Sequence, residues 1–326
     1  MSSARLAAAP ISWGVCEVPG WGDVLPVDQV LAEMAALGLG ATELGPPGFL
    51  PEEAEALTAN LEAHGLTLVG GFLALVLHEP AVRDATLAEV ERACALLARA
   101  GAQVLVLAAA TGLDGYDTSH THDPSDTRTG DPAGKLDDTQ WKCLVETLAD
   151  VASIAAQHDL VATVHPHVGT HIETSPEVER FLASSPLPLC LDTGHLLIGG
   201  ADPVDIARRH GHRVAHVHLK DVDARVAAQV RSGELGYQQA VSAGLYRPLG
   251  QGDLAVREVI QALTAAGYGG WWVLEQDTAL PPREANSYPT DTEHDNARRQ
   301  PQLDTAASIA YLKAALPPET LEKETP

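Results

Sequence analysis

Four short apolar segments of the chain each end in a polar residue of a type that binds metal ions. In chain order these residues are His165, Asp192, His218 and Glu275. The separations are 27 residues from 165 to 192, 26 from 192 to 218 and 57 from 218 to 275. Because a strand, its loop and a crossover helix take roughly 25 to 30 residues, this spacing predicts neighbouring parallel strands, the last after an enlarged repeat. Two imidazoles and two carboxylates are therefore expected at one edge of a sheet.

This set of side chains suits a divalent cation with mixed oxygen and nitrogen ligands. Mn²⁺, Co²⁺, Fe²⁺, Zn²⁺ and Mg²⁺ are all compatible with it, and the absence of thiolates argues against a structural zinc site. With four protein ligands, a water or a substrate oxygen could complete the shell. The alternative is that each residue is a polar group at a barrel mouth without a metal. Four of them at one level favour the metal site.

Further polar residues surround this set in the sequence, and they could carry acid–base chemistry. A ketone polarised by a metal has an acidic α-proton, which a neighbouring imidazole or amine can remove. His167 lies two residues beyond His165 and would point to the same side; it could be a base or could orient a ligand. Lys220 could be a base, an electrostatic clamp or a charge at the rim. His195 and Asp277 complete the group.

Three residues are candidates for contact with a substrate, each with a structural alternative. Glu43 follows the second predicted strand and could hold a substrate hydroxyl. Trp13 could form a wall of the pocket or belong to the core. Arg247 could clamp a substrate oxygen or lie on the surface, within a lid that ends in Asp253 as a helix N-cap. His120 and His122 are expected to be solvated in a polar loop.

Composition and charge exclude several classes of function. The net charge is −23, from 44 acidic and 21 basic residues, so the surface repels nucleic acids and anionic membranes. We expect no nucleic-acid or membrane partner, a small-molecule substrate, and homo-oligomerisation as an open question. Four cysteines without a C-x-x-C pair indicate reduced thiols, and no segment resembles a signal peptide or a transmembrane helix, so a cytoplasmic location is expected.

Alternating strand and helix patterns predict a parallel α/β fold. The expected strands are 6–11, 41–45, 66–77, 103–108, 161–164, 188–191, 214–217 and 271–274. The expected helices are 28–38, 51–64, 86–100, 140–158, 177–183, 203–210, 255–266 and 305–316. No G-x-G-x-x-G turn follows the first strand, and ligand-type residues end at least four strands, which favours a closed (β/α)₈ TIM barrel. We expect one domain over 1–326, with its core at about 6–316 and long loops after strands 4 (111–138) and 7 (222–252).

At this point a family resemblance is visible in the motifs. They are Ala9-Pro10-Ile11-Ser12-Trp13-Gly14, Thr42-Glu43-Leu44-Gly45, His165-Pro166-His167-Val168-Gly169-Thr170, Leu191-Asp192-Thr193-Gly194-His195, His216-Val217-His218-Leu219-Lys220-Asp221 and Gly250-Gln251-Gly252-Asp253. Together they resemble the xylose-isomerase-like TIM-barrel superfamily, and their order is most similar to that of inosose (2-keto-myo-inositol) dehydratases. The resemblance covers roughly residues 6–316. It implies a divalent metal, commonly Mn²⁺ or Co²⁺, at the four residues that open this section, and a place in inositol or other carbohydrate catabolism.

One position departs from part of the superfamily. Ketose 3-epimerases carry a glutamate where this chain has His165, and they use it with the glutamate of the last strand as an acid/base pair. The resemblance therefore favours a lyase that eliminates water from a keto-cyclitol or keto-sugar. In this hypothesis His167 or Lys220 removes the α-proton, and His195 or Glu275 assists the leaving hydroxyl.

Several alternatives share the same site. Aldose–ketose isomerisation or epimerisation is the second hypothesis, and cleavage of a 3-keto-glycoside is the third. A non-catalytic sugar-binding barrel, which would need no metal, is a fourth reading from a different class.

Overall fold

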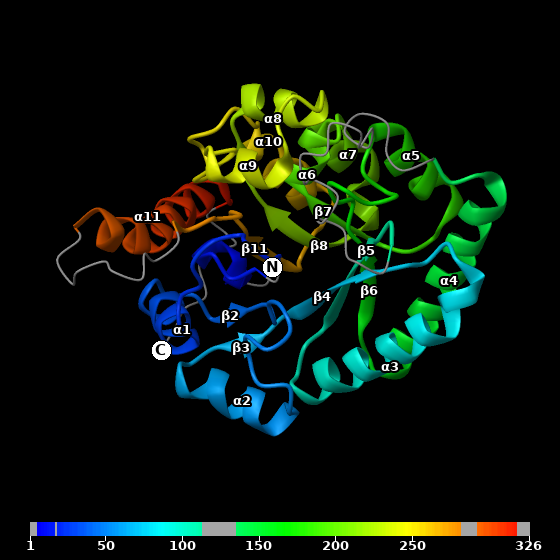
Figure 1. Cartoon of the computed structure of the whole chain (residues 1–326), viewed down its shortest axis with the longest axis horizontal. Helices are drawn as coiled ribbons and strands as arrows, with labels where there is room; N and C mark the ends of the chain where they lie inside the picture. Colours follow the sequence, from blue (N-terminus) through cyan, green and yellow to red (C-terminus); the bar gives the residue numbers. More distant parts are fainter. Residues whose placement is uncertain (1–4, 17, 113–134, 282–291, 318–326) are drawn as a thin grey trace.

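The computed structural model describes residues 5–16, 18–112, 135–281 and 292–317, and it shows a barrel of parallel strands surrounded by helices (Figure 1). The barrel strands are β1 (Arg5–Ala8), β2 (Ala41–Thr42), β3 (Thr67–Leu68), β4 (Gly70–Leu75), β5 (Val104–Ala109), β6 (Val161–Val164), β7 (Leu189–Asp192), β8 (Val214–Leu219) and β11 (Trp271–Leu274). Their order is β3-β2-β1-β11-β8-β7-β6-β5-β4. The predicted TIM barrel is confirmed.

One residue explains how nine strand segments make a closed barrel of eight. β3 and β4 are separated only by Val69, so they form a single third strand, as the sequence predicts at 66–77. The Val69 amide donates to the Thr42 carbonyl at 2.9 Å, and the Val69 carbonyl accepts from the amide of Gln103 at 2.9 Å. Val69 thus joins β2 on one side to β5 on the other, and the sheet closes on itself.

Most of the helices cover the outside of the barrel, and the others lie in the loops that follow β7 and β8. The helices are α1 (Val27–Ala36), α2 (Ala54–Ala63), α3 (Arg83–Arg99), α4 (Asp138–Gln157), α5 (Ser175–Ser184), α6 (Thr193–Ile198), α7 (Pro203–His210), α8 (Ala224–Arg231), α9 (Tyr237–Ser242), α10 (Val256–Ala265) and α11 (Thr292–Ala315). Short 3₁₀ turns are η1 (Pro10–Trp13), η2 (Pro80–Val82) and η4 (Gly211–Arg213). No helix in the described parts of the chain is long and apolar enough to cross a bilayer.

Four local features differ from the sequence-based expectation. Ile11 belongs to η1 rather than to the first strand. The loop after the seventh barrel strand, which is β8, contains α8, α9 and a two-stranded antiparallel sheet of β9 (Asp221–Val222) and β10 (Tyr246–Arg247). Asp253 does not cap α10, because the N-cap of that helix is Ala255. The carboxylate of Asp253 accepts a hydrogen bond from the Ala224 amide instead. α11 begins well before 305 and continues through Pro301. The loop predicted over 111–138 falls mostly outside the described residues.

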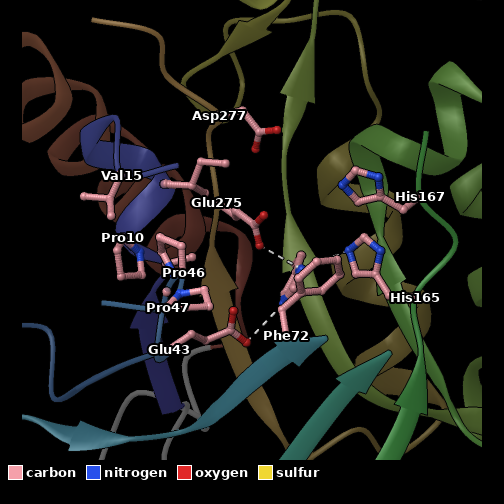
Figure 2. Close-up of a pocket in the computed structure, with 14 residues that line it drawn as sticks. Pro10, Val15, Glu43, Pro46, Pro47, Phe72, His165, His167, Glu275 and Asp277 are labelled. Carbon is pink, nitrogen blue, oxygen red and sulfur yellow. Dashed lines mark hydrogen bonds and ion pairs between the residues drawn. The ribbon is translucent and has the colours of Figure 1, made fainter. Parts of the chain in front are cut away.

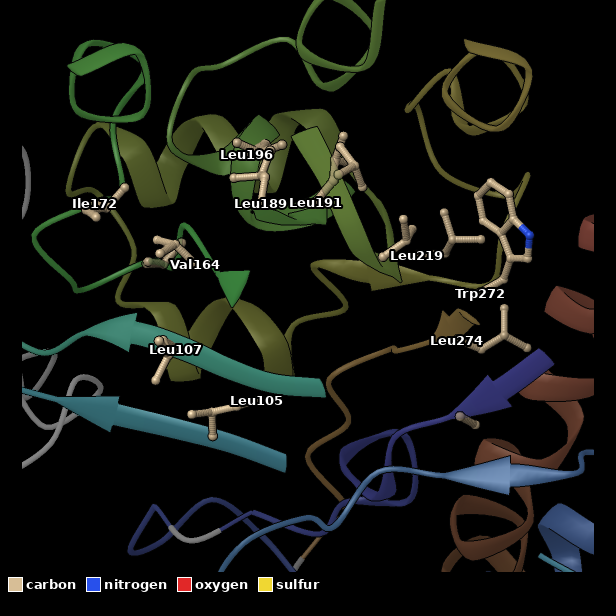
Figure 3. Packing of buried hydrophobic residues seen from close by; sticks show 14 of the residues in the cluster. Leu105, Leu107, Val164, Ile172, Leu189, Leu191, Leu196, Leu219, Trp272 and Leu274 are labelled. Carbon is tan, nitrogen blue, oxygen red and sulfur yellow. The ribbon is translucent and has the colours of Figure 1, made fainter. Parts of the chain in front are cut away.

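Strand alternation divides the side chains into two sets. Leu105 and Leu107 of β5 and Leu189 and Leu191 of β7 belong to the same large apolar core beneath the helices (Figure 3). Val106, between the two leucines of β5, and Cys190, between the two leucines of β7, belong to a separate small cluster and face the barrel interior. Because the period of a strand is two residues, every second position leads inward. At the C-terminal ends of the strands these inward positions meet at one mouth of the barrel (Figure 2).

Two buried histidines near this mouth give the fold a dependence on pH. His78 follows β4 and His171 follows β6, and their rings meet edge to face with centroids 4.3 Å apart. Glu79 lies 3.6 Å from His78 and is exposed. Burial, together with the neighbouring His78, lowers the pKa of His171 to about 4. His171 is therefore neutral in the fold at a pH where the unfolded chain is already protonated.

We expect the free energy of unfolding to fall as the pH drops from about 6.5 to 4. Over this range the unfolded state takes up a proton at residue 171 that the folded state does not, which removes up to about 3 kcal/mol. Urea unfolding of the wild type and of His171→Leu at pH 7 and pH 5 measures this. The variant should lose less stability between the two values. An equal loss in both proteins would contradict the assignment to His171.

Candidate metal centre and active site

The four ligand-type residues predicted from the sequence converge at the C-terminal mouth of the barrel. Nε2 of His165 lies 3.1 Å from Nδ1 of His218 and 3.4 Å from Oδ2 of Asp192. Nδ1 of His218 lies 2.8 Å from Oε2 of Glu275 and 3.7 Å from Oδ2 of Asp192. Asp192 pairs with His218 in the register of β7 and β8. All four side chains are on inward positions of neighbouring strands.

The polar atoms of this cluster fit a divalent cation. Among the described residues, several buried polar atoms lack a hydrogen-bond partner, and two of them are carboxylate oxygens of this cluster, Asp192 Oδ2 and Glu275 Oε2. A buried carboxylate oxygen without a donor is costly unless a cation lies beside it. The grouping of Asp192, His218 and Glu275 brings one ligand atom from each within 4.8 Å of the others, as does that of His165, Asp192 and His195. The donors are imidazole nitrogens and carboxylate oxygens, which suit Mn²⁺, Co²⁺, Fe²⁺, Zn²⁺ or Mg²⁺.

A short helix after β7 brings His195 into the site. Asp192 is the N-cap of α6, and its Oδ1 accepts from the His195 amide at 2.8 Å. One carboxylate oxygen therefore starts the helix while the other faces the candidate metal centre. The rings of His195 and His167 lie 3.8 Å apart between centroids. The first turn of α6 thus positions the side chains of both Asp192 and His195.

Lys220 is buried at the centre of three carboxylates. Its Nζ contacts Oδ1 of Asp277, and lies 2.8 Å from Oε1 of Glu275 and 3.7 Å from Oδ2 of Asp192. Tyr237 donates to the other oxygen of Asp277 at 2.6 Å. Burial alone would lower the pKa of Lys220, but Asp277, Glu275 and Asp192 outweigh it and raise the pKa well above its usual value. The side chain is a buried ammonium held by opposite charges.

His167 has a different environment. Its Nδ1 lies 2.7 Å from the Val168 carbonyl, which can only accept, so Nδ1 carries the proton. Burial, with His165 and Lys220 nearby, holds the pKa of His167 well below its ordinary range. The neutral ring therefore has its lone pair on Nε2.

Glu43 and His216 extend the cluster down the barrel axis. Oε1 of Glu43 accepts from Nε2 of His216 at 2.7 Å and from Nε2 of His218 at 3.1 Å. Burial opposes the charge on Glu43, but His218 and the hydrogen bond from His216 lower its pKa to about 2. Glu43 is thus an ionised carboxylate engaged by two imidazoles.

An open cavity lies above the cluster, and the empty space of about 710 Å³ that it encloses includes solvent at its mouth. Its polar side carries residues of the site, and Pro10, Val15, Pro46, Pro47 and Phe72 border it with apolar surface (Figure 2). The polar lining residues are Glu43, His165, His167, His218, Glu275 and Asp277. Apolar and polar surface in one cavity suits a small ring that has both C–H bonds and oxygens.

Two residues expected to touch a substrate lie elsewhere. Trp13 does not line the cavity: it is fully buried in the apolar core, and its indole donates to Glu33 of α1 at 2.8 Å. The 3₁₀ turn after β1 rotates it away from the mouth. Arg247 borders a smaller hollow beside Glu275 and lies 3.6 Å from Asp223. His120 and His122 are outside the described residues.

The sequence reading overlooked several residues of the site. His216 carries a usable signal, because it stands two positions before His218 and so faces the same side of β8. Phe72 is on an inward position of β4 and was hidden in a run of apolar residues. Tyr237 and Tyr246, whose hydroxyls are 2.7 Å apart, come from the long insertion after β8. Nothing in their spacing predicts their approach to Asp277.

Residues 31–307 match the family model described as a xylose isomerase-like TIM barrel. The chain belongs to this family. An inosose dehydratase from Geobacillus kaustophilus is 31% identical over 281 residues, which cover 85% of this chain and 89% of that protein. The rhizopine catabolism protein MocC from Rhizobium meliloti is 32% identical over 279 residues, which cover 85% of this chain and 82% of that protein.

Solved structures of xylose isomerase-like barrels share the fold. The crystal structure of the IolI protein with a bound zinc atom aligns with a TM-score of 0.66 at 13% sequence identity and covers 96% of this chain and 99% of that one. At this identity the likeness establishes the barrel alone.

Proposed function

We propose that the protein is a divalent-metal-dependent carbon–oxygen lyase that removes water from a keto-cyclitol or keto-sugar. The observation that carries the proposal is the convergence of His165, Asp192, His218 and Glu275 beside two further imidazoles and a buried ammonium. The likeness to inosose dehydratase over 85% of the chain supports a dehydratase rather than another reaction of such barrels.

The four converging residues would hold the cation. Mn²⁺ or Co²⁺ is our first expectation, and Zn²⁺, the ion of the IolI structure, also accepts imidazole and carboxylate ligands. When bound, the cation supplies a Lewis acid for a ketone oxygen, which makes the neighbouring C–H acidic.

His167 is the proposed base. Because its Nδ1–H is donated to the Val168 carbonyl, Nε2 can accept the α-proton of a ketone in the cavity that His167 lines. The electron pair of that C–H bond then forms the carbon–carbon double bond as the β-hydroxyl departs.

Lys220 is the proposed acid, with His195 beside it. The Lys220 ammonium lies against Glu275 and Asp277 and 3.4 Å from Nε2 of His195. A proton from the Lys220 ammonium, or from Nε2–H of His195, whose Nδ1 accepts from the Val168 amide at 3.4 Å, converts the departing hydroxide to water. Glu275, which would bind the cation through one oxygen and lies 2.8 Å from the Lys220 ammonium through the other, would orient Lys220 rather than donate a proton itself.

Epimerisation by two opposed carboxylates is less well supported. The family resemblance implies a glutamate in ketose 3-epimerases at the position of His165, and the imidazole here lies beside Asp192 and His218 instead. Elimination needs one base and one acid, which the site offers in His167 and Lys220.

The test is an assay of protein reconstituted with Mn²⁺ or Co²⁺ on scyllo-inosose, following the absorbance of the dione product. We expect turnover that depends on the metal and is lost in His165→Ala and Glu275→Ala, because each variant removes a ligand. A ketohexose assayed in parallel distinguishes epimerisation from elimination. Tight metal binding with no dione formation would contradict the dehydratase proposal while leaving the metal centre in place.

A further inference from the structure

We propose that Glu43 is a positioning residue: anchored by His216, it fixes the imidazole of His218 so that Nδ1 faces the candidate metal centre. The inference rests on the metal centre of the proposed function, but not on the identity of the substrate. It also replaces the expectation that Glu43 holds a substrate hydroxyl.

The geometry places Glu43 and the candidate ligands on opposite sides of one imidazole. Oε1 of Glu43 lies 3.1 Å from Nε2 of His218, and Oε2 of Glu275 lies 2.8 Å from Nδ1 of the same ring. Figure 2 marks both interactions with dashed lines that reach from Glu43 and from Glu275. The ring of His218 is 2% exposed, so its orientation is set by these groups and not by solvent.

The chemistry of imidazole makes this arrangement selective. An ionised carboxylate only accepts hydrogen bonds, so Glu43 requires the proton of His218 on Nε2. A histidine that binds a metal is neutral, and its lone pair would then be on Nδ1, the nitrogen that faces Asp192 and Glu275. A metal ligand held in this way is more basic and better oriented than one whose second nitrogen has no partner.

His216 explains why Glu43 stays in place. It is completely buried one inward position below His218, and its Nε2 donates to the same oxygen of Glu43 at 2.7 Å. His216 is absent from the cavity lining. We infer that its contribution to the site passes through Glu43.

Titration of the apoprotein with Co²⁺, followed by visible absorption, tests the assignment in Glu43→Gln. Glutamine keeps the size of the side chain but replaces a charged acceptor with a weaker neutral one. We expect Co²⁺ affinity to fall about 10- to 100-fold and the d–d bands to shift. His216→Gln should weaken binding in the same direction by a smaller factor.

Glu33→Gln is the matched control, because Glu33 is also a hydrogen-bonded glutamate but contacts Trp13 and Gln29 outside the site. It should bind Co²⁺ as the wild type does. With saturating Co²⁺, Glu43→Gln should keep the wild-type KM for scyllo-inosose and recover part of its kcat.

Three results would separate the possibilities. Wild-type Co²⁺ affinity and spectrum in Glu43→Gln, with a raised KM, would overturn the proposal and return Glu43 to substrate binding. A wild type that binds no Co²⁺ would also overturn it. A wild type that binds Co²⁺ but does not dehydrate scyllo-inosose would contradict only the proposed function. A loss of Co²⁺ affinity in Glu43→Gln would still support the positioning role.

Discussion

Replacing His167 with glutamine is expected to lower kcat by about 10²- to 10⁴-fold, the usual contribution of a general base. The amide is similar in reach but cannot take up the α-proton. The decisive measurement is exchange of that proton with solvent: the wild type in D₂O should replace the α-proton of unreacted ketone with deuterium, and His167→Gln should not do so at a measurable rate.

Metal affinity is the internal control for this experiment. His167 lies beside the candidate ligands but is not one of the four residues assigned to the metal, so the variant should bind Co²⁺ within about threefold of the wild type. A loss of both metal and activity would reassign His167 to the metal centre. Exchange at the wild-type rate would exclude it as the base and direct attention to Lys220, the other candidate.

Lys220→Met is expected to lower the free energy of unfolding by about 3–5 kcal/mol. The substitution removes the cation that Asp277 and Glu275 contact and leaves their buried negative charges without the ammonium that balances them, which is the costly case for a buried ion pair. Urea unfolding of the metal-free protein at pH 7.5 measures the loss. Lyase activity should also disappear, because the proposed acid is gone.

The double variant Lys220→Met/Asp277→Asn separates charge from packing. Asparagine keeps the hydrogen bond from Tyr237, which donates to this side chain at 2.6 Å, and removes one of the uncompensated charges. It should regain part of the stability lost in Lys220→Met without regaining activity. If Asp277→Asn instead adds a further loss, the destabilisation comes from a cavity rather than from electrostatics.

Much of the site could be predicted because strands impose simple geometry. His165, Asp192, His218 and Glu275 each follow an apolar run, and parallel strands deliver their C-terminal residues to one edge. The sequence therefore determined the barrel and the four residues that converge at its mouth. The two-residue period also places Lys220 on the same side of its strand as His218.

Tertiary structure alone decided which partners these residues have. Glu43 meets His216 and His218 across separations of 173 and 175 residues, and Tyr237 reaches Asp277 from an insertion whose path no local pattern fixes. Trp13 does not line the cavity, because a 3₁₀ turn follows β1 where the sequence suggested a longer strand. Local spacing determines the face on which a side chain lies, because backbone periodicity is a property of neighbouring residues. The closing of the barrel determines what that side chain meets, because it brings together strands that are distant in the sequence.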